Sequence, residues 1–378
     1  MLGFPVDYME YALSLAELAL GYTSPNPAVG AVIVKDGQVV GMGHTQPPGL
    51  AHAEIMALQQ AGDRAKGARM YVSLEPCCYH GRTPPCTRAI VDAGLSAVHI
   101  AMLDPNPLVL GKGAQELKEA GVEVYTGEYE EKAREINEGY IKYITTGLPF
   151  VIAKFAMSLD GKIATKNGDS RWISGDEARH YVHRLRHIVD AIMVGANTII
   201  VDNPKLSARG FCGDKGGKTR LQPLRVIIDG KGRIPPGAQI FKEPGKTLVV
   251  VAKPADIKKK DRLSKAGAEI LEMEAKDGII ALNNLFEVLG KREVTSILVE
   301  GGSGLFGTLF DNGLIDKVIV YISPIIIGGQ GATSAVGGIG ANKVSESIRL
   351  QNVTIRSFGE EVLISGYLGK NKNVYGNN

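Results

Sequence analysis

Short runs of apolar, often β-branched residues alternate along the chain with segments whose apolar positions recur every three or four residues. The first pattern predicts buried strands, and the second predicts amphipathic helices that cover them. Before residue 147 we expect helices at 7–20, 51–61, 86–93 and 114–120, and strands at 29–35, 38–43, 69–74, 97–101 and 122–126. This alternation is typical of an α/β sandwich.

A second α/β series begins at residue 150. We expect strands at 151–155, 191–194, 224–229, 247–251, 269–271, 296–299 and 317–322, and helices at 176–187, 255–266 and 303–312. The turn residues at 145–149 separate the two series without forming a long linker. Because 378 residues exceed what one hydrophobic core usually serves, the sequence predicts two domains, 1–147 and 148–378.

Composition and charge narrow the class of protein. With 44% hydrophobic and 22% charged residues, the chain is typical of a globular protein. The first 147 residues carry a net charge of −6 and the remainder +9, but the basic run at 258–260 is interpreted as a solvated helix face. No basic segment is interleaved with aromatic residues, no apolar run is long enough to span a membrane, and no export signal is visible. We therefore expect a cytoplasmic protein that binds neither nucleic acid nor membrane.

A metal-binding pattern occupies the first half. His52 and Glu54 open one predicted helix, Cys77 follows a strand, and Cys86 opens the next helix. This order is typical of zinc deaminases, in which one histidine and two thiolates hold Zn²⁺ while a carboxylate that is not a ligand moves the proton. The sequence thus predicts His52, Cys77 and Cys86 as ligands and Glu54 as the catalytic acid and base.

The simplest interpretation is a chain with a deaminase half followed by a second catalytic half. Two alternatives to it remain at this point. A structural zinc module on a nucleotide-sensing domain would need a fourth protein ligand, and we interpret the neighbouring Cys78 as a packing residue. The other alternative is a nucleoside or base deaminase whose C-terminal half binds a nucleotide without catalysis.

A glycine-rich turn is the clearest feature of the second half. Gly302, Gly304 and Gly307 follow the strand at 296–299 and open a helix, an arrangement that lets backbone amides approach a phosphate. The next strand, at 317–322, carries no terminal acid, which argues against a Rossmann domain. The chain holds 47 glycines in 378 residues, about 12%, against a usual level of roughly 7%. The glycines between 328 and 340 have no evident role in the sequence.

Five motifs together resemble the RibD family of riboflavin biosynthesis, in which a pyrimidine deaminase is fused to a pyrimidine reductase. They are Ser24-Pro25-Asn26-Pro27-Ala28-Val29-Gly30, Ala51-His52-Ala53-Glu54, Leu74-Glu75-Pro76-Cys77, Gly81-Arg82-Thr83-Pro84-Pro85-Cys86 and Asp104-Pro105-Asn106-Pro107. The resemblance covers nearly the whole chain. It implies a cytidine-deaminase-like α/β/α sandwich followed by a dihydrofolate-reductase-like α/β domain, with Zn²⁺ and NADPH as cofactors. The implied substrates are phosphoribosyl pyrimidines, and we expect a homo-oligomer.

The resemblance also implies site residues. Asn26 would bind the base and Arg82 the 5′-phosphate in the deaminase. The reductase substrate would meet Ser170, Arg186, Leu206, Arg209 and Glu300, where two guanidinium groups suit a phosphate; Arg186 could instead pair with a neighbouring acid. The cofactor would meet Met157, Trp172, Thr198, Asp202, Gly230, Gly302, Ser303, Gly304, Leu305, Phe306, Gly307 and Thr308.

Overall fold

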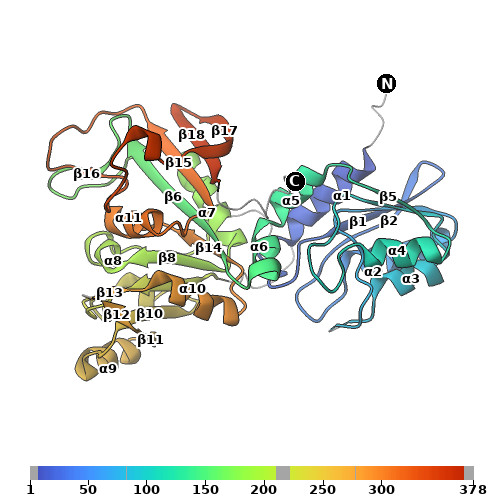
Figure 1. Ribbon diagram of the computed structural model, residues 1–378, viewed down its shortest axis with the longest axis horizontal. Coiled ribbons are helices and arrows are strands. Elements are labelled where there is room, and N and C mark those ends of the chain that lie inside the picture. The colour runs from blue at the N-terminus through green and yellow to red at the C-terminus, as the bar shows by residue number, and fades with distance from the viewer. Residues whose placement is uncertain (1–6, 82, 210–221, 277, 370–378) are drawn as a thin grey trace. The chain divides into compact units, whose positions relative to one another are not determined.

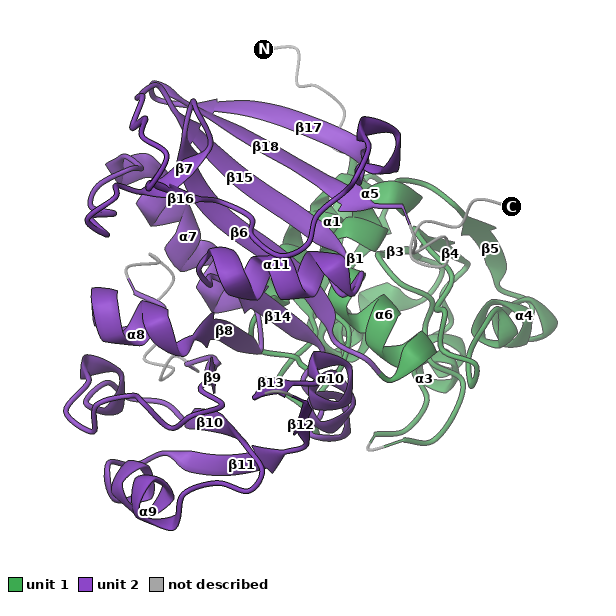
Figure 2. Cartoon of the chain, turned by 60° about the vertical axis from the view of Figure 1, so that its left-hand side comes forward, with its two compact units in different colours: residues 1–147, 373–378 green, residues 148–372 purple. Residues whose placement is uncertain are grey.

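The computed structural model describes residues 7–81, 83–209, 222–276 and 278–369. The described residues divide into two compact units, one that ends at Gly147 and one that begins at Leu148 (Figure 2). Each unit has its own sheet and its own helices.

The first unit is built on a five-stranded sheet with the order β2-β1-β3-β4-β5. Strand β1 runs antiparallel to β2 and β3, whereas β3, β4 and β5 are parallel. The strands are β1 (Gly30–Lys35), β2 (Gln38–His44), β3 (Arg69–Val72), β4 (Ala97–Ile100) and β5 (Glu123–Thr126).

Helices cover both faces of this sheet, with α2, α3 and α4 on one side and α1 and α5 on the other (Figure 1). Helix α2 lies directly on β2 because two glycines leave room: a Cβ on Gly41 would lie 2.2 Å from the Ala57 carbonyl oxygen, and one on Gly43 would lie 2.4 Å from the Met56 Cβ. This close approach fixes the start of α2. The helices are α1 (Tyr8–Ala19), α2 (Ala53–Ala61), α3 (Cys86–Asp92), α4 (Lys112–Glu119), α5 (Glu130–Ile136) and α6 (Glu138–Thr146).

The second unit contains a nine-stranded sheet with the order β11-β10-β9-β8-β14-β6-β15-β18-β17. The first seven strands in this order are parallel, and β18 and β17 close the sheet as an antiparallel hairpin. The strands are β6 (Phe150–Ser158), β8 (Ala191–Gly195), β9 (Leu224–Ile228), β10 (Thr247–Ala252), β11 (Glu269–Met273), β14 (Ser296–Val299), β15 (Lys317–Ser323), β17 (Leu350–Phe358) and β18 (Glu361–Leu368).

Smaller elements complete this unit. Two short pairs lie outside the main sheet, β7 (Lys162–Ala164) with β16 (Thr333–Ser334) and β12 (Ala275–Lys276) with β13 (Ile279–Ile280). The helices are α7 (Asp176–Ile188), α8 (Ala196–Asp202), α9 (Ile257–Lys265), α10 (Leu282–Lys291) and α11 (Ser303–Asp311). Helices α10 and α11 bury Leu285 and Phe306 against Val151 and Val299 of the sheet. Carboxyl ends of parallel strands meet at one edge, where α/β proteins bind ligands.

The predicted strands and helices are present, but several elements were not predicted from the sequence. Helices α5, α6, α8 and α10 are among them, as is the hairpin β17–β18. Strand β17 is exposed along nearly all its length, so it lacks the buried apolar face that sequence patterns detect in a half-buried strand. Over the described residues, no helix combines the length and apolar character needed to cross a membrane.

Candidate functional sites

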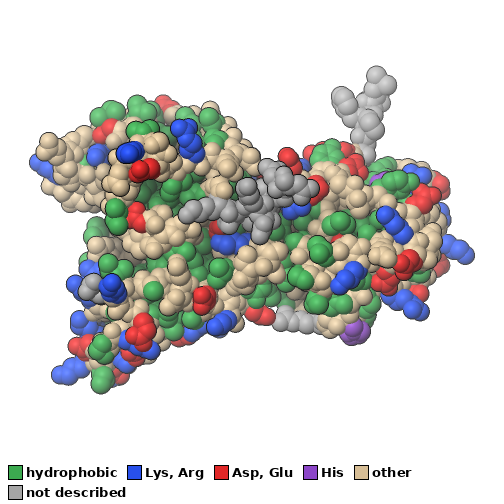
Figure 3. Space-filling view, viewed as in Figure 1, with side chains coloured by type: hydrophobic (Ala, Val, Ile, Leu, Met, Phe, Trp, Pro, Cys, Tyr) green, Lys and Arg blue, Asp and Glu red, His purple; other side chains and the backbone are tan. Residues whose placement is uncertain are grey.

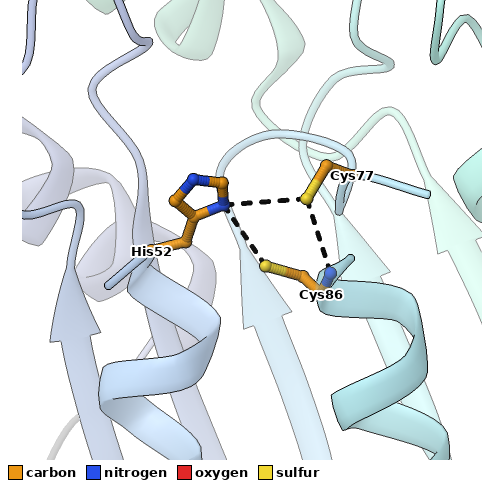
Figure 4. Close-up of side chains that lie close together, drawn as sticks. All are labelled: His52, Cys77 and Cys86. Atoms are coloured by element: carbon orange, nitrogen blue, oxygen red, sulfur yellow. Dashed lines mark hydrogen bonds between the residues drawn. The ribbon is translucent and has the colours of Figure 1, made fainter. Parts of the chain in front are cut away.

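Three side chains of the first unit converge where α2 and α3 begin (Figure 4). His52 is the residue before α2 and Cys86 is the first residue of α3, whereas Cys77 lies in the loop that follows β3. The His52 Nδ1 atom lies 3.7 Å from the Cys77 sulfur and 3.4 Å from the Cys86 sulfur. All three donor atoms lie within 4.8 Å of one another, and in the described chain no other group of three such side chains meets this criterion.

This donor set fits Zn²⁺, which binds imidazole nitrogen and thiolate sulfur. The Thr83 hydroxyl lies 3.3 Å from His52 Nε2, which leaves Nδ1 facing the two cysteines. A hydrogen bond to the second ring nitrogen is the usual way in which proteins orient a metal-binding histidine. Three protein donors leave a coordination position free, as in catalytic zinc sites.

The charges of the site favour a bound cation. A hydrogen bond from Cys86 lowers the pKa of Cys77 to about 4, with further help from His52 and the Cys86 backbone N–H. The same pairing with Cys77, together with burial, raises the pKa of Cys86. The two sulfurs therefore share one proton until a cation neutralises both.

Glu54 lies in the first turn of α2 beside this cluster and is 4% exposed. Burial raises its pKa to about 7, and the negative charge of Cys77 adds to the effect. A carboxyl group with a pKa near neutrality can both accept and return a proton, as general acid–base catalysis requires.

A buried carboxylate that sequence reasoning missed supports the Cys77 loop. Glu75 accepts hydrogen bonds from the backbone N–H groups of Asp104, Gly111 and Ala114, at 3.0, 2.9 and 3.0 Å. Its only sequence signal was its place two residues before Cys77. These three bonds tie the ligand loop to the segment that leads into α4.

The remaining first-unit residues are placed less fully. Asn26 lies in the loop between α1 and β1 and is half-buried, while Arg82 lies outside the described residues. The side chain of Cys78 points toward the carbonyl oxygen of Leu108, 4.0 Å away, and is not part of the metal-binding group. The base and phosphate contacts of Asn26 and Arg82 therefore stay predictions.

In the second unit, a pocket of about 960 Å³ opens at the carboxyl ends of β6 and β14. All five predicted substrate residues line it, and so do two of the predicted cofactor residues. These are Ser170, Arg186, Leu206, Arg209 and Glu300, with Trp172 and Asp202.

A compact charge cluster forms one wall of this pocket. Arg186 donates to both carboxylate oxygens of Glu300, at 2.6 and 3.0 Å, and Lys154 Nζ lies 4.0 Å from the same carboxylate. Burial lowers the pKa of Lys154; burial alone would raise that of Glu300, but the charge of Arg186 holds it below its usual value. Lys154 was not among the predicted substrate residues, although a lysine within an apolar strand is a signal.

The expectation that Arg186 and Arg209 together contact a substrate phosphate stays a prediction, and both line the pocket. Arg186 forms the ion pair that the sequence left open as an alternative, because its guanidinium faces the buried Glu300 carboxylate. Arg209 is exposed and lines the pocket, so it remains the cation available to an anionic substrate group.

The loop that precedes α7 carries two further predicted residues. Ser170 donates to Asp202 at 3.2 Å, and Trp172 is 70% exposed with Arg179 stacked 4.5 Å from its ring centre. The end of the loop is tied down by Glu361, which accepts from the Gly175 N–H at 2.5 Å. The loop therefore presents Ser170 and Trp172 to the pocket from a fixed base.

The predicted phosphate cradle lies beside this pocket, at the start of α11. Gly302 precedes the helix, and a Cβ built on it would lie 3.9 Å from the Thr198 hydroxyl oxygen. A Cβ on Gly304 would meet nothing within 4 Å, so that helix turn faces open space. The start of α11 and Thr198 on α8 thus leave room for a dinucleotide phosphate.

The later residues of the same stretch pack into the protein. Phe306 is fully buried, lies 5.2 Å from the ring of Phe155, and donates its N–H to the Gly302 carbonyl. The Leu305 side chain packs partly against the same core, and the Thr308 hydroxyl donates to Gly304 within the helix. Of the seven predicted residues from Gly302 to Thr308, the first three, Gly302, Ser303 and Gly304, are therefore best placed to contact a ligand.

Three of the glycines between 328 and 340, at positions 337, 338 and 340, contact α11. A Cβ on Gly307 would lie 2.3 Å from the Gly338 nitrogen, and the Gly337 N–H donates to the Ser303 carbonyl. Asp311 accepts the N–H groups of Ile339 and Gly340 at 2.7 and 3.1 Å. Residues 337–340 therefore pack against α11, and the missing side chain of Gly307 makes room for them.

Two predicted cofactor residues lie outside both the pocket lining and the cradle. Met157 is half-buried near the end of β6. Gly230 follows β9, and a Cβ there would lie 2.9 Å from the Gly278 carbonyl oxygen. Their contacts with a cofactor stay predictions.

Together the two sites define a class of protein, a zinc-dependent deaminase joined in one chain to a reductase. Residues 5–102 match the family model for the cytidine and deoxycytidylate deaminase zinc-binding region, and residues 149–364 match the RibD C-terminal domain. The chain belongs to the RibD family of riboflavin biosynthesis proteins. The expected fold class, cytidine-deaminase-like followed by dihydrofolate-reductase-like, is confirmed.

Relatives cover nearly the entire chain. The riboflavin biosynthesis protein RibD of Aquifex aeolicus is 41% identical over 95% of this chain and 97% of its own length, and that of Escherichia coli is 38% identical over 94% and 97%. A solved structure of Acinetobacter baumannii RibD has a TM-score of 0.84 at 37% identity, covering 96% of this chain and 98% of its own. A Thermotoga maritima structure has a TM-score of 0.80 at 34% identity, with coverages of 96% and 97%.

Proposed function

We propose that the chain carries out two consecutive steps of riboflavin biosynthesis. The first unit removes the 2-amino group of 2,5-diamino-6-ribosylamino-4(3H)-pyrimidinone 5′-phosphate as ammonia. The second reduces the ribosyl chain of the product with NADPH to give 5-amino-6-(5-phosphoribitylamino)uracil. The Thermotoga maritima relative is described as a diaminohydroxyphosphoribosylaminopyrimidine deaminase and 5-amino-6-(5-phosphoribosylamino)uracil reductase. The carrying observation is the joint presence of the His52, Cys77 and Cys86 cluster with Glu54 and of the charged pocket.

In the deaminase step, His52, Cys77 and Cys86 would hold Zn²⁺, which when bound would make a water acidic enough to act as a nucleophile near neutral pH. Glu54 accepts the proton of that water and returns it to the departing amine, a role that its buried position and raised pKa suit. Thr83 keeps His52 in the orientation that binds, and Glu75 keeps the Cys77 loop in place.

In the reductase step, the pocket residues hold and orient the substrate. Arg209 binds the substrate phosphate, while Ser170 and Glu300 contact the sugar and base. Thr198, Gly302 and the first amides of α11 would hold NADPH, which when bound would supply the hydride. Arg186 and Lys154 neutralise Glu300, which keeps that carboxylate ionised and fixed inside the pocket.

A coupled assay tests the proposal. Purified protein with the diaminopyrimidine phosphate is followed for ammonia release and for loss of NADPH absorbance, with and without NADPH. We expect ammonia in both cases and NADPH oxidation only after deamination. Ammonia release without NADPH binding or oxidation would favour the alternative, a deaminase with a non-catalytic C-terminal module.

Two further expectations belong to the proposal. We expect a homo-oligomer, which sedimentation of the purified protein would reveal by a mass above 40.3 kDa. We also expect a cytoplasmic location, which fractionation of the source cells would test.

A further inference from the structure

The order of the strands indicates where the far end of the cofactor lies. The substrate pocket opens at the carboxyl ends of β6 and β14, and the sheet continues from β14 to β8 and then β9. A dinucleotide with its nicotinamide end at this pocket would extend past the first residues of α11 and α8. Its other end would therefore reach the carboxyl end of β9. Two strand spacings separate β9 from β14, about 10 Å.

One cation is fixed at the carboxyl end of β9. Arg233 donates from Nη1 to the Asn197 side-chain oxygen at 3.0 Å, and Asn197 belongs to the same helix α8 as Thr198. Its Nε lies 3.6 Å from Asp229, a carboxylate with no solvent exposure, while the Arg233 side chain keeps 47% of its surface exposed. Asn197 and Asp229 thus hold the guanidinium in place, while about half of the Arg233 side chain stays exposed to solvent.

Helix α9 fixes the loop that carries this arginine. Lys259 donates to the Lys231 carbonyl at 2.8 Å, and Arg262 donates to the carbonyls of Gly232 and Ile234 at 3.2 and 3.3 Å. Lys and Arg side chains gather at the α9 corner of this unit, with acidic side chains between them (Figure 3). The loop is therefore rigid and lies in basic surroundings.

The acid at this strand end is unavailable to a ligand. In the Rossmann fold, another parallel α/β sheet, enzymes that use NAD have an acid at a strand end that binds the ribose 2′-hydroxyl, whereas those that use NADP have an arginine nearby. Asp229 is fully buried and accepts the Ile234 N–H at 2.9 Å. Between residues 229 and 234 the exposed charges are Lys231 and Arg233.

We infer that Arg233 binds the 2′-phosphate of NADPH and so determines the preference for NADPH over NADH. A phosphate monoester carries a charge near −2 at neutral pH, and the planar guanidinium can donate two parallel hydrogen bonds to it. Asp229 and Asn197 orient the arginine for this contact. The inference rests on the proposed function of the second unit.

Calorimetric binding to the full chain tests the inference without requiring turnover. The probes are NADPH, NADH, 2′,5′-ADP and AMP, measured on the wild type, Arg233→Ala and Lys258→Ala. The last variant removes an equal charge from an exposed position on α9. For Arg233→Ala we expect NADPH and 2′,5′-ADP to bind about 10- to 100-fold more weakly, with NADH and AMP within about 2-fold.

The possible outcomes separate this inference from the proposed function. Lys258→Ala should bind all four probes like the wild type, and Arg233→Lys should recover part of the NADPH affinity. Unchanged NADPH affinity in Arg233→Ala, or an equal loss for NADPH and NADH, overturns the role of Arg233 and leaves the reductase proposal standing. A wild-type chain that binds neither dinucleotide overturns both.

Discussion

The metal site and the reductase pocket are built from very different lengths of sequence. His52 and Cys86 are 34 positions apart, and all the zinc ligands come from two neighbouring helix starts and the loop between them. Arg186 and Glu300 are 114 positions apart and meet only because β14 is a neighbour of β8, the strand that follows α7. The first site can be recognised as a local motif, whereas the second exists only in the folded sheet.

The two sites also differ in how their charges are balanced. The Cys77 and Cys86 sulfurs compete for one proton, which makes the first site one that a cation stabilises. In the second site, the positive charges of Arg186 and Lys154 already balance the negative charge of the Glu300 carboxylate. The donor atoms of the first site therefore indicate its chemistry by themselves, whereas the chemistry of the second site depends on which charged side chains the fold pairs.

The largest effect is expected for Glu54→Gln. Deamination should fall by about 10²- to 10⁴-fold because the proton carrier is lost, while bound zinc stays at the wild-type level. Ammonia release, metal content and NADPH oxidation with the deaminated substrate provide the three measurements. Glu131→Gln, at an exposed position on α5, is the matched control. Parallel loss of the reductase step would show that the two sites are not independent.

Breaking the charge cluster of the second unit should lower stability. Arg186→Met leaves Glu300 buried with only Lys154, 4.0 Å away, as a counter-charge. We expect the free energy of unfolding of that unit to drop by about 3–5 kcal/mol, with deamination retained. Denaturant unfolding followed by circular dichroism measures the drop. The double variant with Glu300→Gln should recover part of it; no recovery would mean that Arg186 acts through packing alone.

Asp104 offers a comparison by pH. Burial raises its pKa to about 6, although hydrogen bonds from the Asn106 N–H and the Tyr140 hydroxyl oppose the shift. In the second unit, the pKa of Asp160 is lowered to about 2 by donors from Ser158, Ile327 and Gly328. The folded first unit therefore holds the Asp104 proton more tightly than the unfolded chain does.

The stability that this proton contributes is present below pH 4 and is lost as the pH rises through 6. Asp104→Asn should therefore gain about 2–3 kcal/mol relative to the wild type between pH 4 and pH 7. Unfolding free energies of both proteins across this range provide the measurement. Parallel pH curves would contradict the buried, protonated state of Asp104.

The smallest effect is expected for Arg209→Ala. Losing one exposed, charge-assisted contact should raise the KM of the reductase about 10-fold, with kcat and deamination within about 2-fold. Steady-state kinetics of each half-reaction at two salt concentrations measure this. A similar loss in both reactions would refute the placement of Arg209 at the reductase substrate.

Much of the first site was predictable from the sequence. Short connections keep His52, Cys77 and Cys86 near the ends of adjacent elements, so their order alone indicates a shared site. The role of Glu75 was not predictable, since its three backbone donors lie 29 to 39 positions away. The presence of a carboxylate in a motif does not indicate which backbone N–H groups will donate hydrogen bonds to it.

In the second unit, the residue types were predicted more reliably than their partners. Arg186 was expected at a phosphate, and the sequence did not show that it pairs with Glu300. Gly307 was expected at the cofactor, and the sequence did not show that Gly338 packs against it. In each case the contact comes from a segment distant in the sequence. The pattern of apolar residues or glycines does not indicate which segment that is.

The sequence by itself indicated the two α/β units, the group of His52, Cys77 and Cys86, and the glycine-rich start of α11, because periodicity, donor chemistry and short loops act over a few residues. Only the tertiary structure decided that Glu300 is paired with Arg186, that Asp229 is buried behind Arg233 and that residues 337–340 pack against α11. Electrostatic and packing interactions depend on distance in space, and the sheet order that sets those distances is a property of the whole fold.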